Sequence, residues 1–302
     1  MNETVAIRTS GLAKRYGSRW ALRDCTLEIP SGSVTALVGP NGAGKTTLLH
    51  LVIGLVEPTS GTVDVFGRSP RRDAKEVLPR LGFVAQDHPL HRNLTIAETL
   101  TYGRKLNPRW NQQLAVSRVE RLGLSMRQKV GRLSGGQQAQ VALTLALAKQ
   151  PQLLVLDEPV ASLDPLARRE FLNAVMEAVV EEGITVVLSS HIVAELERVC
   201  DYLVTLADGA TQLNGSISQI VASHRLLTGP RSEAASVARV HDVIRESHTE
   251  RQTTLLVRAN GHVYDSRWEQ HEVDLEEIVL AYLGYQSGNG ASPTAALEKV
   301  RS

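Results

Sequence analysis

The chain has 302 residues, 42% of them hydrophobic and 22% charged, which predicts a globular protein with one large domain or one domain with an appendage. Its formal net charge of +1 argues against a general attraction to anionic lipid, and we expect no nucleic-acid partner. Two cysteines without CxxC spacing, no signal-peptide pattern and no long apolar run predict a cytoplasmic protein, neither secreted nor membrane-spanning.

The first part of the chain predicts strands that lead into a helix. Residues 1 to about 30 have the pattern of short strands with turns. Residues 33–39 (SVTALVG) are a continuous apolar run that meets a glycine-rich turn, as a buried parallel strand does. Residues 46–55 (TTLLHLVIGL) have helical spacing ended by Gly54, and residues 61–67 (GTVDVFG) alternate like a strand.

The middle of the chain predicts helices and further buried strands. From about residue 90 to 150 the pattern is mostly helical. Three buried strands follow, in the segments LLVLDEP (153–159), ITVVLSSH (184–191) and YLVTLADG (202–209). Strands that alternate with helices indicate a mainly parallel α/β sheet.

The character of the sequence changes after about residue 222. Residues 222–237 (ASHRLLTGPRSEAASV) predict a polar connection, and residues 253–260 (TTLLVRAN) predict a strand. In DLEEIVLAYLG, Asp274 is the expected N-cap of a helix. One face of this helix is apolar and carries Leu275, Ile278, Val279, Tyr282 and Leu283. The last fifteen or so residues are expected to be disordered.

The strongest local motif is GPNGAGKTT, which fits G-x-x-x-x-G-K-[ST] between a predicted strand and a predicted helix. Glycines let the backbone curl, so that its amides and the helix N-terminus face phosphates. Lys45 is expected to reach the β- and γ-phosphates of ATP, and Thr46 to hold Mg²⁺. The predicted nucleotide-binding residues of this loop are Gly39, Pro40, Asn41, Gly42, Ala43, Gly44, Lys45, Thr46 and Thr47.

The segment LLVLDEP is expected to supply further residues of the same nucleotide site. Asp157 ends an apolar strand, where it can bind Mg²⁺ through a water molecule. Glu158 follows at the carboxyl end of the strand, where ligands bind in open α/β sheets. Its carboxylate is placed to orient or deprotonate the attacking water. The two motifs together predict a P-loop NTPase.

A third motif, LSGGQ (Leu133 to Gln137), precedes a helical run and predicts another anion site at a helix start. One ATP does not need two cradles in one chain, whereas two facing chains could each close the other's ATP. The motif therefore predicts a dimer held by ATP, with contacts from Ser134, Gly135, Gly136 and Gln137.

GPNGAGKTT, LSGGQ, LLVLDEP, SLD (Ser162 to Asp164) and His191 occur in the order seen in ATPase subunits of ABC transporters, which the chain resembles over about residues 4 to 220. This resemblance implies an ABC ATPase domain over 1–222, with an N-terminal antiparallel β subdomain and an inserted helical subdomain at about 88–150. An α+β accessory region at 223–287 and a disordered tail at 288–302 would follow.

The resemblance also assigns roles that the motifs alone do not. Tyr16 would stack on adenine, and His191 would contact the γ-phosphate. Gln86 would lie between nucleotide and membrane partner and join the magnesium ligands Thr46 and Asp157. The implied catalytic set is Lys45, Gln86, Glu158 and His191. Asp164 would lie at the dimer interface, although SLDP is also a turn and helix cap, and both roles can hold together.

One departure from the family pattern is Ala139 in LSGGQQAQ, where many relatives carry a basic residue; its loss is expected to alter interface or partner contacts. His88 and His91 lack a third ligand and do not predict a metal site.

NPRW (Asn107 to Trp110) and the DLEEIVLAYLG ending resemble bacterial drug- and antibiotic-exporter ATPases. This second resemblance implies export of a small hydrophobic or peptide-like compound. Separate membrane subunits would be driven by a homodimer or heterodimer peripheral to the inner face of the membrane, through a groove near Gln86. An importer subunit is the nearest alternative, and a non-transport ABC ATP switch is a further one. A chromosome-organising protein would need a long coiled coil between Thr47 and Leu133, where the sequence has no sustained heptads. A ribosome-associated switch would usually carry a second motif like GPNGAGKTT, and the sequence has one.

Overall fold

The computed structural model describes residues 4–190, 192–259 and 267–284, and its centre is a six-stranded sheet in the order β5-β6-β7-β3-β8-β9. All neighbouring strands in this sheet are parallel except β8 and β9, so the predicted mainly parallel α/β core is confirmed. In sheet order the strands are Leu81–Val84 (β5), Leu153–Leu156 (β6), Thr185–Ser190 (β7), Val34–Val38 (β3), Tyr202–Ala207 (β8) and Ala210–Ser216 (β9).

Side chains of the parallel strands alternate between two apolar layers, because successive residues of a strand point to opposite faces. On β6, Leu154 and Leu156 join the layer that contains α5 and α6, whereas Leu153 and Val155 join the layer around α1. Burial on both faces explains why these strands are continuously apolar in sequence. The helices are Lys45–Val52 (α1), Gly135–Ala148 (α5) and Pro165–Glu182 (α6).

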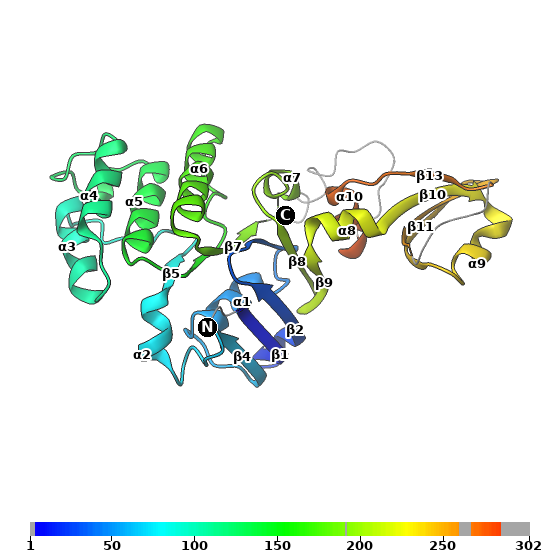
Figure 1. The fold of residues 1–302 in the computed structure, drawn as a ribbon, viewed down its shortest axis with the longest axis horizontal. Helices are drawn as coiled ribbons and strands as arrows, with labels where there is room; N and C mark the ends of the chain where they lie inside the picture. Colours follow the sequence, from blue (N-terminus) through cyan, green and yellow to red (C-terminus); the bar gives the residue numbers. More distant parts are fainter. Residues whose placement is uncertain (1–3, 191, 260–266, 285–302) are drawn as a thin grey trace.

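A three-stranded antiparallel sheet covers α1 from the other side, in the order β2-β1-β4, as the lower part of Figure 1 shows. Its strands are Val5–Tyr16 (β1), Arg19–Pro30 (β2) and Ser60–Val65 (β4). We predicted short strands before residue 30, but β1 and β2 are 12 residues each. Register shifts along the β1–β2 pair, one of them across Gly11, let a long hairpin bend where the sequence shows an interruption.

The segment predicted as a helical insertion contains α3 (Ile96–Leu106), α4 (Gln112–Arg121) and α5, which lie at the left of Figure 1. Thr95 caps α3 through a capping box with Glu98, and Asn111 caps α4. The helices share a small apolar cluster that includes Leu100, Val119 and Val141. Two one-turn helices, Ala74–Val77 (α2) and Val193–Leu196 (α7), flank the core sheet.

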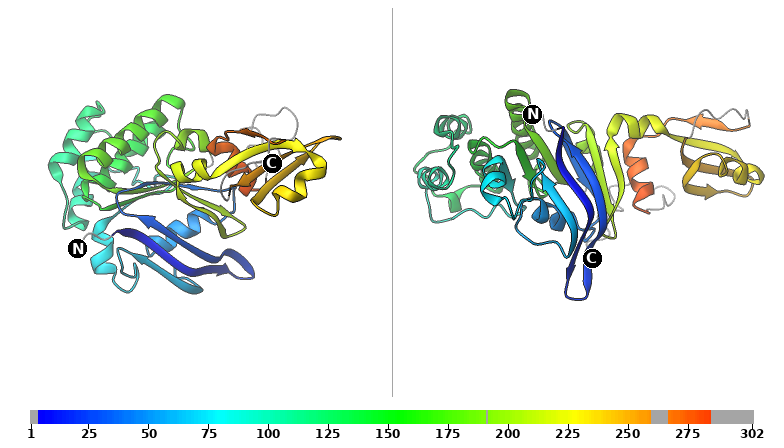
Figure 2. Two further views of the ribbon diagram at one scale, coloured as in Figure 1. Left: turned by 45° about the vertical axis from the view of Figure 1, so that its right-hand side comes forward. Right: turned by 60° about the horizontal axis from the view of Figure 1, so that its bottom comes forward.

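The C-terminal region forms a second antiparallel sheet in the order β11-β12-β10-β13, at the right of Figure 1 and in both views of Figure 2. The predicted polar connection is wrong, because it contains a strand, β10, in which Leu227 is fully buried. Gly229 and Pro230 interrupt the alternation of apolar and polar residues, so that pattern did not predict this strand. The elements are Ile217–Ser223 (α8), His224–Pro230 (β10), Ala234–Val237 (α9), Asp242–His248 (β11), Gln252–Arg258 (β12), Glu269–His271 (β13) and Leu275–Tyr282 (α10).

The final helix, α10, begins at the predicted N-cap, where the Asp274 side chain accepts a hydrogen bond from the amide of Glu277 at 2.7 Å. Leu275, Ile278 and Val279 are buried in the same apolar cluster as α5 and α6. The apolar face predicted for this helix is therefore covered by the apolar layer of the central sheet and by Leu256 of β12. The predicted tail, 288–302, lies outside the described residues.

Within the described ranges, no helix has both the length and the apolar character that crossing a bilayer requires.

Candidate functional site

The phosphate-binding loop follows β3 and curls in a way that only glycine permits at two positions. A Cβ on Gly39 would lie 2.4 Å from the carbonyl oxygen of Leu206, and one on Gly44 would lie 2.5 Å from that of Ala21. Gly44 also has φ of 105°, which is left-handed backbone that favours glycine. It occupies the N-cap of α1 without a side-chain acceptor, so the first amides of this helix are available to an anion.

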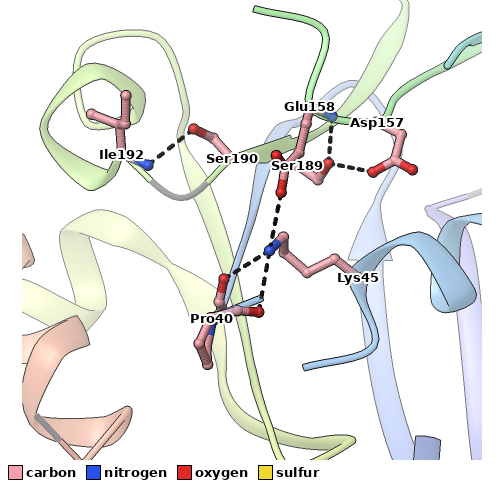
Figure 3. Close-up of polar contacts among 8 residues, drawn as sticks. Pro40, Lys45, Asp157, Glu158, Ser189, Ser190 and Ile192 are labelled. Atoms are coloured by element: carbon pink, nitrogen blue, oxygen red, sulfur yellow. Dashed lines mark hydrogen bonds and ion pairs between the residues drawn. The ribbon is translucent and has the colours of Figure 1, made fainter. Parts of the chain in front are cut away.

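Lys45 points back across this loop toward the ends of the neighbouring strands, as Figure 3 shows. Its Nζ donates to the carbonyl oxygen of Gly39 at 2.8 Å and lies 3.2 Å from Oε1 of Glu158. The two side chains are only 5% and 13% exposed. Burial increases the Coulomb attraction within this pair but also removes both charges from water at a cost, and a phosphate anion has the right charge to take the place of the carboxylate.

Asp157 and Glu158 follow β6 and are held by a residue that the sequence analysis did not single out. Ser189 on β7 donates its hydroxyl to Oδ1 of Asp157 at 2.8 Å and accepts the amide of Glu158 at 2.7 Å (Figure 3). Asp157 is 3% exposed, and Glu158 has φ of 43°. The signal was the pair of serines that ends the apolar strand ITVVLSS. Ser189 thus fixes the direction of the Asp157 carboxylate and the position of the Glu158 backbone.

The other predicted nucleotide-site residues that the structure describes lie on β1, on α1 and in the loops after β3 and β5. Gln86 is exposed and follows β5 by two residues, and Thr46 is exposed on the first turn of α1. Tyr16 ends β1 with 49% of its surface exposed. His191 lies outside the described residues. The other loop residues follow β3, with Ala43 buried, Pro40 and Thr47 half-buried, and Asn41 exposed.

The second predicted cradle is at the start of α5. The Ser134 hydroxyl accepts the amide of Gln137 at 3.2 Å, and the Gln137 side chain accepts the amide of Ser134 at 3.0 Å. This capping box leaves Gly135 and Gly136 at the exposed end of the helix. A Cβ on Gly136 would lie 2.8 Å from the Cβ of Ala167, so α5 and α6 start side by side.

Asp164 is the N-cap of α6, where its carboxylate accepts the amides of Leu166 and Ala167 at 3.0 Å each. The helix-cap role weighed for SLDP is therefore confirmed. Ala139, by contrast, is fully buried in the core cluster. Its side chain faces the core, and the prediction that the missing charge alters interface or partner contacts stays a prediction.

A groove of about 320 Å³ lies beside Gln86, between β5 and the helical insertion. Its wall is mostly apolar and includes Leu90, Tyr102 and Trp110. Burial lowers the pKa of His88, which also lines the groove, and His91 packs edge-on against Tyr102 at 5.8 Å between ring centroids. Among the described residues, no three His, Cys, Asp or Glu side chains are grouped as metal ligands.

Comparison with protein families matches residues 22–161 to the ABC transporter family, and a model for an AAA domain matches residues 129–197. The bacitracin transport ATP-binding protein BcrA of Bacillus licheniformis is 33% identical over 68% of this chain and 68% of its own length. A sulfate/thiosulfate import ATP-binding protein, CysA of Synechococcus elongatus, is 35% identical over 72% of this chain and 65% of its own. The Nod factor export ATP-binding protein I of Rhizobium johnstonii is 35% identical over 68% of this chain and 67% of its own length.

Solved structures agree with these relatives. An ATP-binding subunit of an ABC transporter has a TM-score of 0.65 and 27% identity, covering 72% of this chain and 92% of that chain. A dimeric bacterial ABC transporter cassette has a TM-score of 0.63 and 26% identity, and the match covers 70% of this chain and 98% of that chain. With the phosphate loop, the paired carboxylates and the LSGGQ helix in place, the chain belongs to the ATP-binding, ATP-hydrolysing subunits of ABC transporters.

Proposed function

We propose that ATP is hydrolysed at the edge of the sheet where α1 meets β6. The observation that carries this is the buried pairing of Lys45 with Glu158, at 3.2 Å, directly above the phosphate loop. Lys45 and the amides that start α1 bind the β- and γ-phosphates, and Tyr16 binds the adenine. Glu158 takes the proton of the attacking water, with Gln86 and His191 beside the γ-phosphate.

Thr46 and Asp157 are the proposed ligands of Mg²⁺, together with Gln86. A hydroxyl, a carboxylate and an amide oxygen are the hard oxygen donors that this ion takes, so the residues fit it. The hydroxyl that Ser189 donates to Asp157 keeps one carboxylate oxygen occupied and leaves the other for the metal shell. When bound, Mg²⁺ would neutralise charge on the phosphates.

ATP is proposed to join two chains of this kind. Ser134, Gly135, Gly136 and Gln137 lie beside the start of α6. The contacts of Ser134 and Gln137 described above are made to each other rather than to the phosphate loop of the same chain. Facing a second chain, this helix start supplies donors to that chain's γ-phosphate. Asp164 lies next to it, where it can couple the two sites in a homodimer or heterodimer.

The groove beside Gln86 is the proposed docking site for a separate membrane subunit at the inner face of the cell membrane. Its apolar wall is large enough to take side chains from a partner, and Tyr102 is half-exposed at its rim. Trp110, from the NPRW segment, packs on Gly103 in the same wall. The segment that resembles exporter ATPases thus lines the surface that would select the partner.

The proposed cargo is a small hydrophobic or peptide-like compound moved outward. Support comes from the NPRW and DLEEIVLAYLG segments and from the exporter relatives named for bacitracin and Nod factor. Import is the second candidate, because a sulfate/thiosulfate import protein is equally similar in sequence.

Transport in inverted membrane vesicles separates the two directions. The chain is co-expressed with the membrane subunit encoded beside it, and co-purification tests whether the two bind each other. Inverted vesicles are made from the same cells, and ATP is added outside them. Accumulation of a hydrophobic peptide inside, absent with Glu158→Gln, would support export. Release of a preloaded solute in the same vesicles would support import, and failure of the two subunits to co-purify would contradict the docking proposal.

A further inference from the structure

The hairpin of β1 and β2 is fastened against the phosphate loop. Tyr16 and Arg19 are cross-strand partners at its tip, and Ala21 and Leu22 of β2 lie against the loop at Gly44. The carbonyl oxygen of Ala21 lies 2.5 Å from where a Cβ on Gly44 would be, which is closer than any side chain allows. The position of the hairpin tip relative to the loop is therefore set by backbone contact.

This contact places an arginine at the mouth of the loop. Nη2 of Arg19 lies 3.3 Å from a Cβ built on Gly42, and the residue is exposed. Within the described part of the chain, we find no hydrogen bond or ion pair for the Arg19 guanidinium. Two basic neighbours have partners of their own. Arg15 lies over the ring of Trp20 at 5.4 Å, and Lys14 donates to the carbonyl oxygen of Glu57 at 2.6 Å and lies 5.1 Å from the centroid of the Tyr16 ring.

We propose that Arg19 binds the phosphate nearest the ribose of the nucleotide, an inference that rests on the ATP site proposed above. With adenine on Tyr16 and the terminal phosphates at Lys45, the ribose and its phosphate must cross the gap between hairpin tip and loop. Arg19 lies along that gap, beside Gly42. A guanidinium presents paired donors to phosphate oxygens, whereas the loop amides and Lys45 serve the outer phosphates. Arg19 is thus a nucleotide-binding residue outside the sequence motifs.

The test compares nucleotide affinities of matched arginine variants by competition with a fluorescent ATP analogue. Arg19→Ala is expected to lose about tenfold in affinity for ATP, ADP and AMP alike, because all three carry this phosphate. Arg19→Lys should recover part of the loss. Arg15→Ala removes an arginine from the same hairpin and should bind like the wild type. Raising KCl from about 0.05 M to about 0.5 M should shrink the difference between Arg19→Ala and wild type, since an exposed charge is screened.

Unchanged AMP affinity in Arg19→Ala would overturn the proposal, and so would a salt-independent loss shared with Arg15→Ala, which would indicate a displaced hairpin. Failure of the ATP site itself gives a different pattern. In that case Lys45→Ala binds ATP as tightly as the wild type, whatever Arg19 does. Thermal melting of each variant confirms that the compared proteins are folded.

Discussion

Replacing Ile278 by alanine tests whether the C-terminal region is structurally part of the ATPase core. Ile278 lies in the middle of α10, is fully buried and belongs to the apolar cluster that also contains β6 and β7 side chains. Truncation to alanine removes three carbons, worth about 2.5 kcal/mol of transfer free energy. The cavity left behind raises the loss of unfolding free energy to about 3 to 4 kcal/mol. For a chain of this size, the melting temperature should fall by about 5 °C.

The assay is thermal and urea unfolding followed by circular dichroism, with ATP titration well below the transition. Val180→Ala is the matched control, because Val180 on α6 is 81% exposed and its truncation should change stability by less than about 0.5 kcal/mol. ATP affinity should be unchanged in both variants, since Ile278 lies on α10 and Val180 on α6, outside the motifs that form the proposed site. A chain ended near residue 222 should likewise bind ATP with lowered stability.

Two results would refute this reasoning. A loss below about 1 kcal/mol for Ile278→Ala would mean that α10 is not docked on the core in solution. A folded variant that loses ATP affinity would mean that the C-terminal region helps to build the nucleotide site.

Of three further predictions, two concern the nucleotide site and one concerns a buried histidine. Glu158→Gln should keep ATP binding and slow turnover about 10²- to 10⁴-fold, and near-wild-type phosphate release would remove it from the catalytic role. Lys45→Ala should weaken ATP binding to the monomer, whereas Ser134→Arg should spare it and block the ATP-dependent dimer in light scattering; equal losses of monomer affinity would contradict the shared site. Burial lowers the pKa of His224, whose Nε2 contacts the Tyr282 hydroxyl at 3.0 Å, so its neutral form stabilises the fold above about pH 6.5 and protonation removes that stability as the pH falls. The melting temperature should therefore drop more steeply between about pH 7 and about pH 5.5 in the wild type than in His224→Asn, and equal slopes would exclude His224 as the cause.

The sequence alone predicted the phosphate loop and the paired carboxylates that the structure places at one edge of the sheet. A phosphate loop needs glycine at tight backbone positions and a lysine at a fixed offset, so GPNGAGKTT predicts geometry as well as composition. Strands buried on both faces are continuously apolar, which located β3, β6 and β7 and therefore the residues at their carboxyl ends. The α10 helix could be predicted equally well, because its N-cap and apolar stripe are local signals.

Contacts between distant segments had to be seen in three dimensions. Ser189 holds the Asp157 carboxylate and the Glu158 backbone from the next strand of the sheet, and Arg19 approaches Gly42 because β2 packs against the loop. Neither of these contacts produces a periodic pattern in the sequence. Strand β10 was missed for the same reason: its residues become a strand by pairing with β12 and β13, not by their own propensity. Local patterns determine which residues can do chemistry, whereas packing of separate segments decides which of them meet.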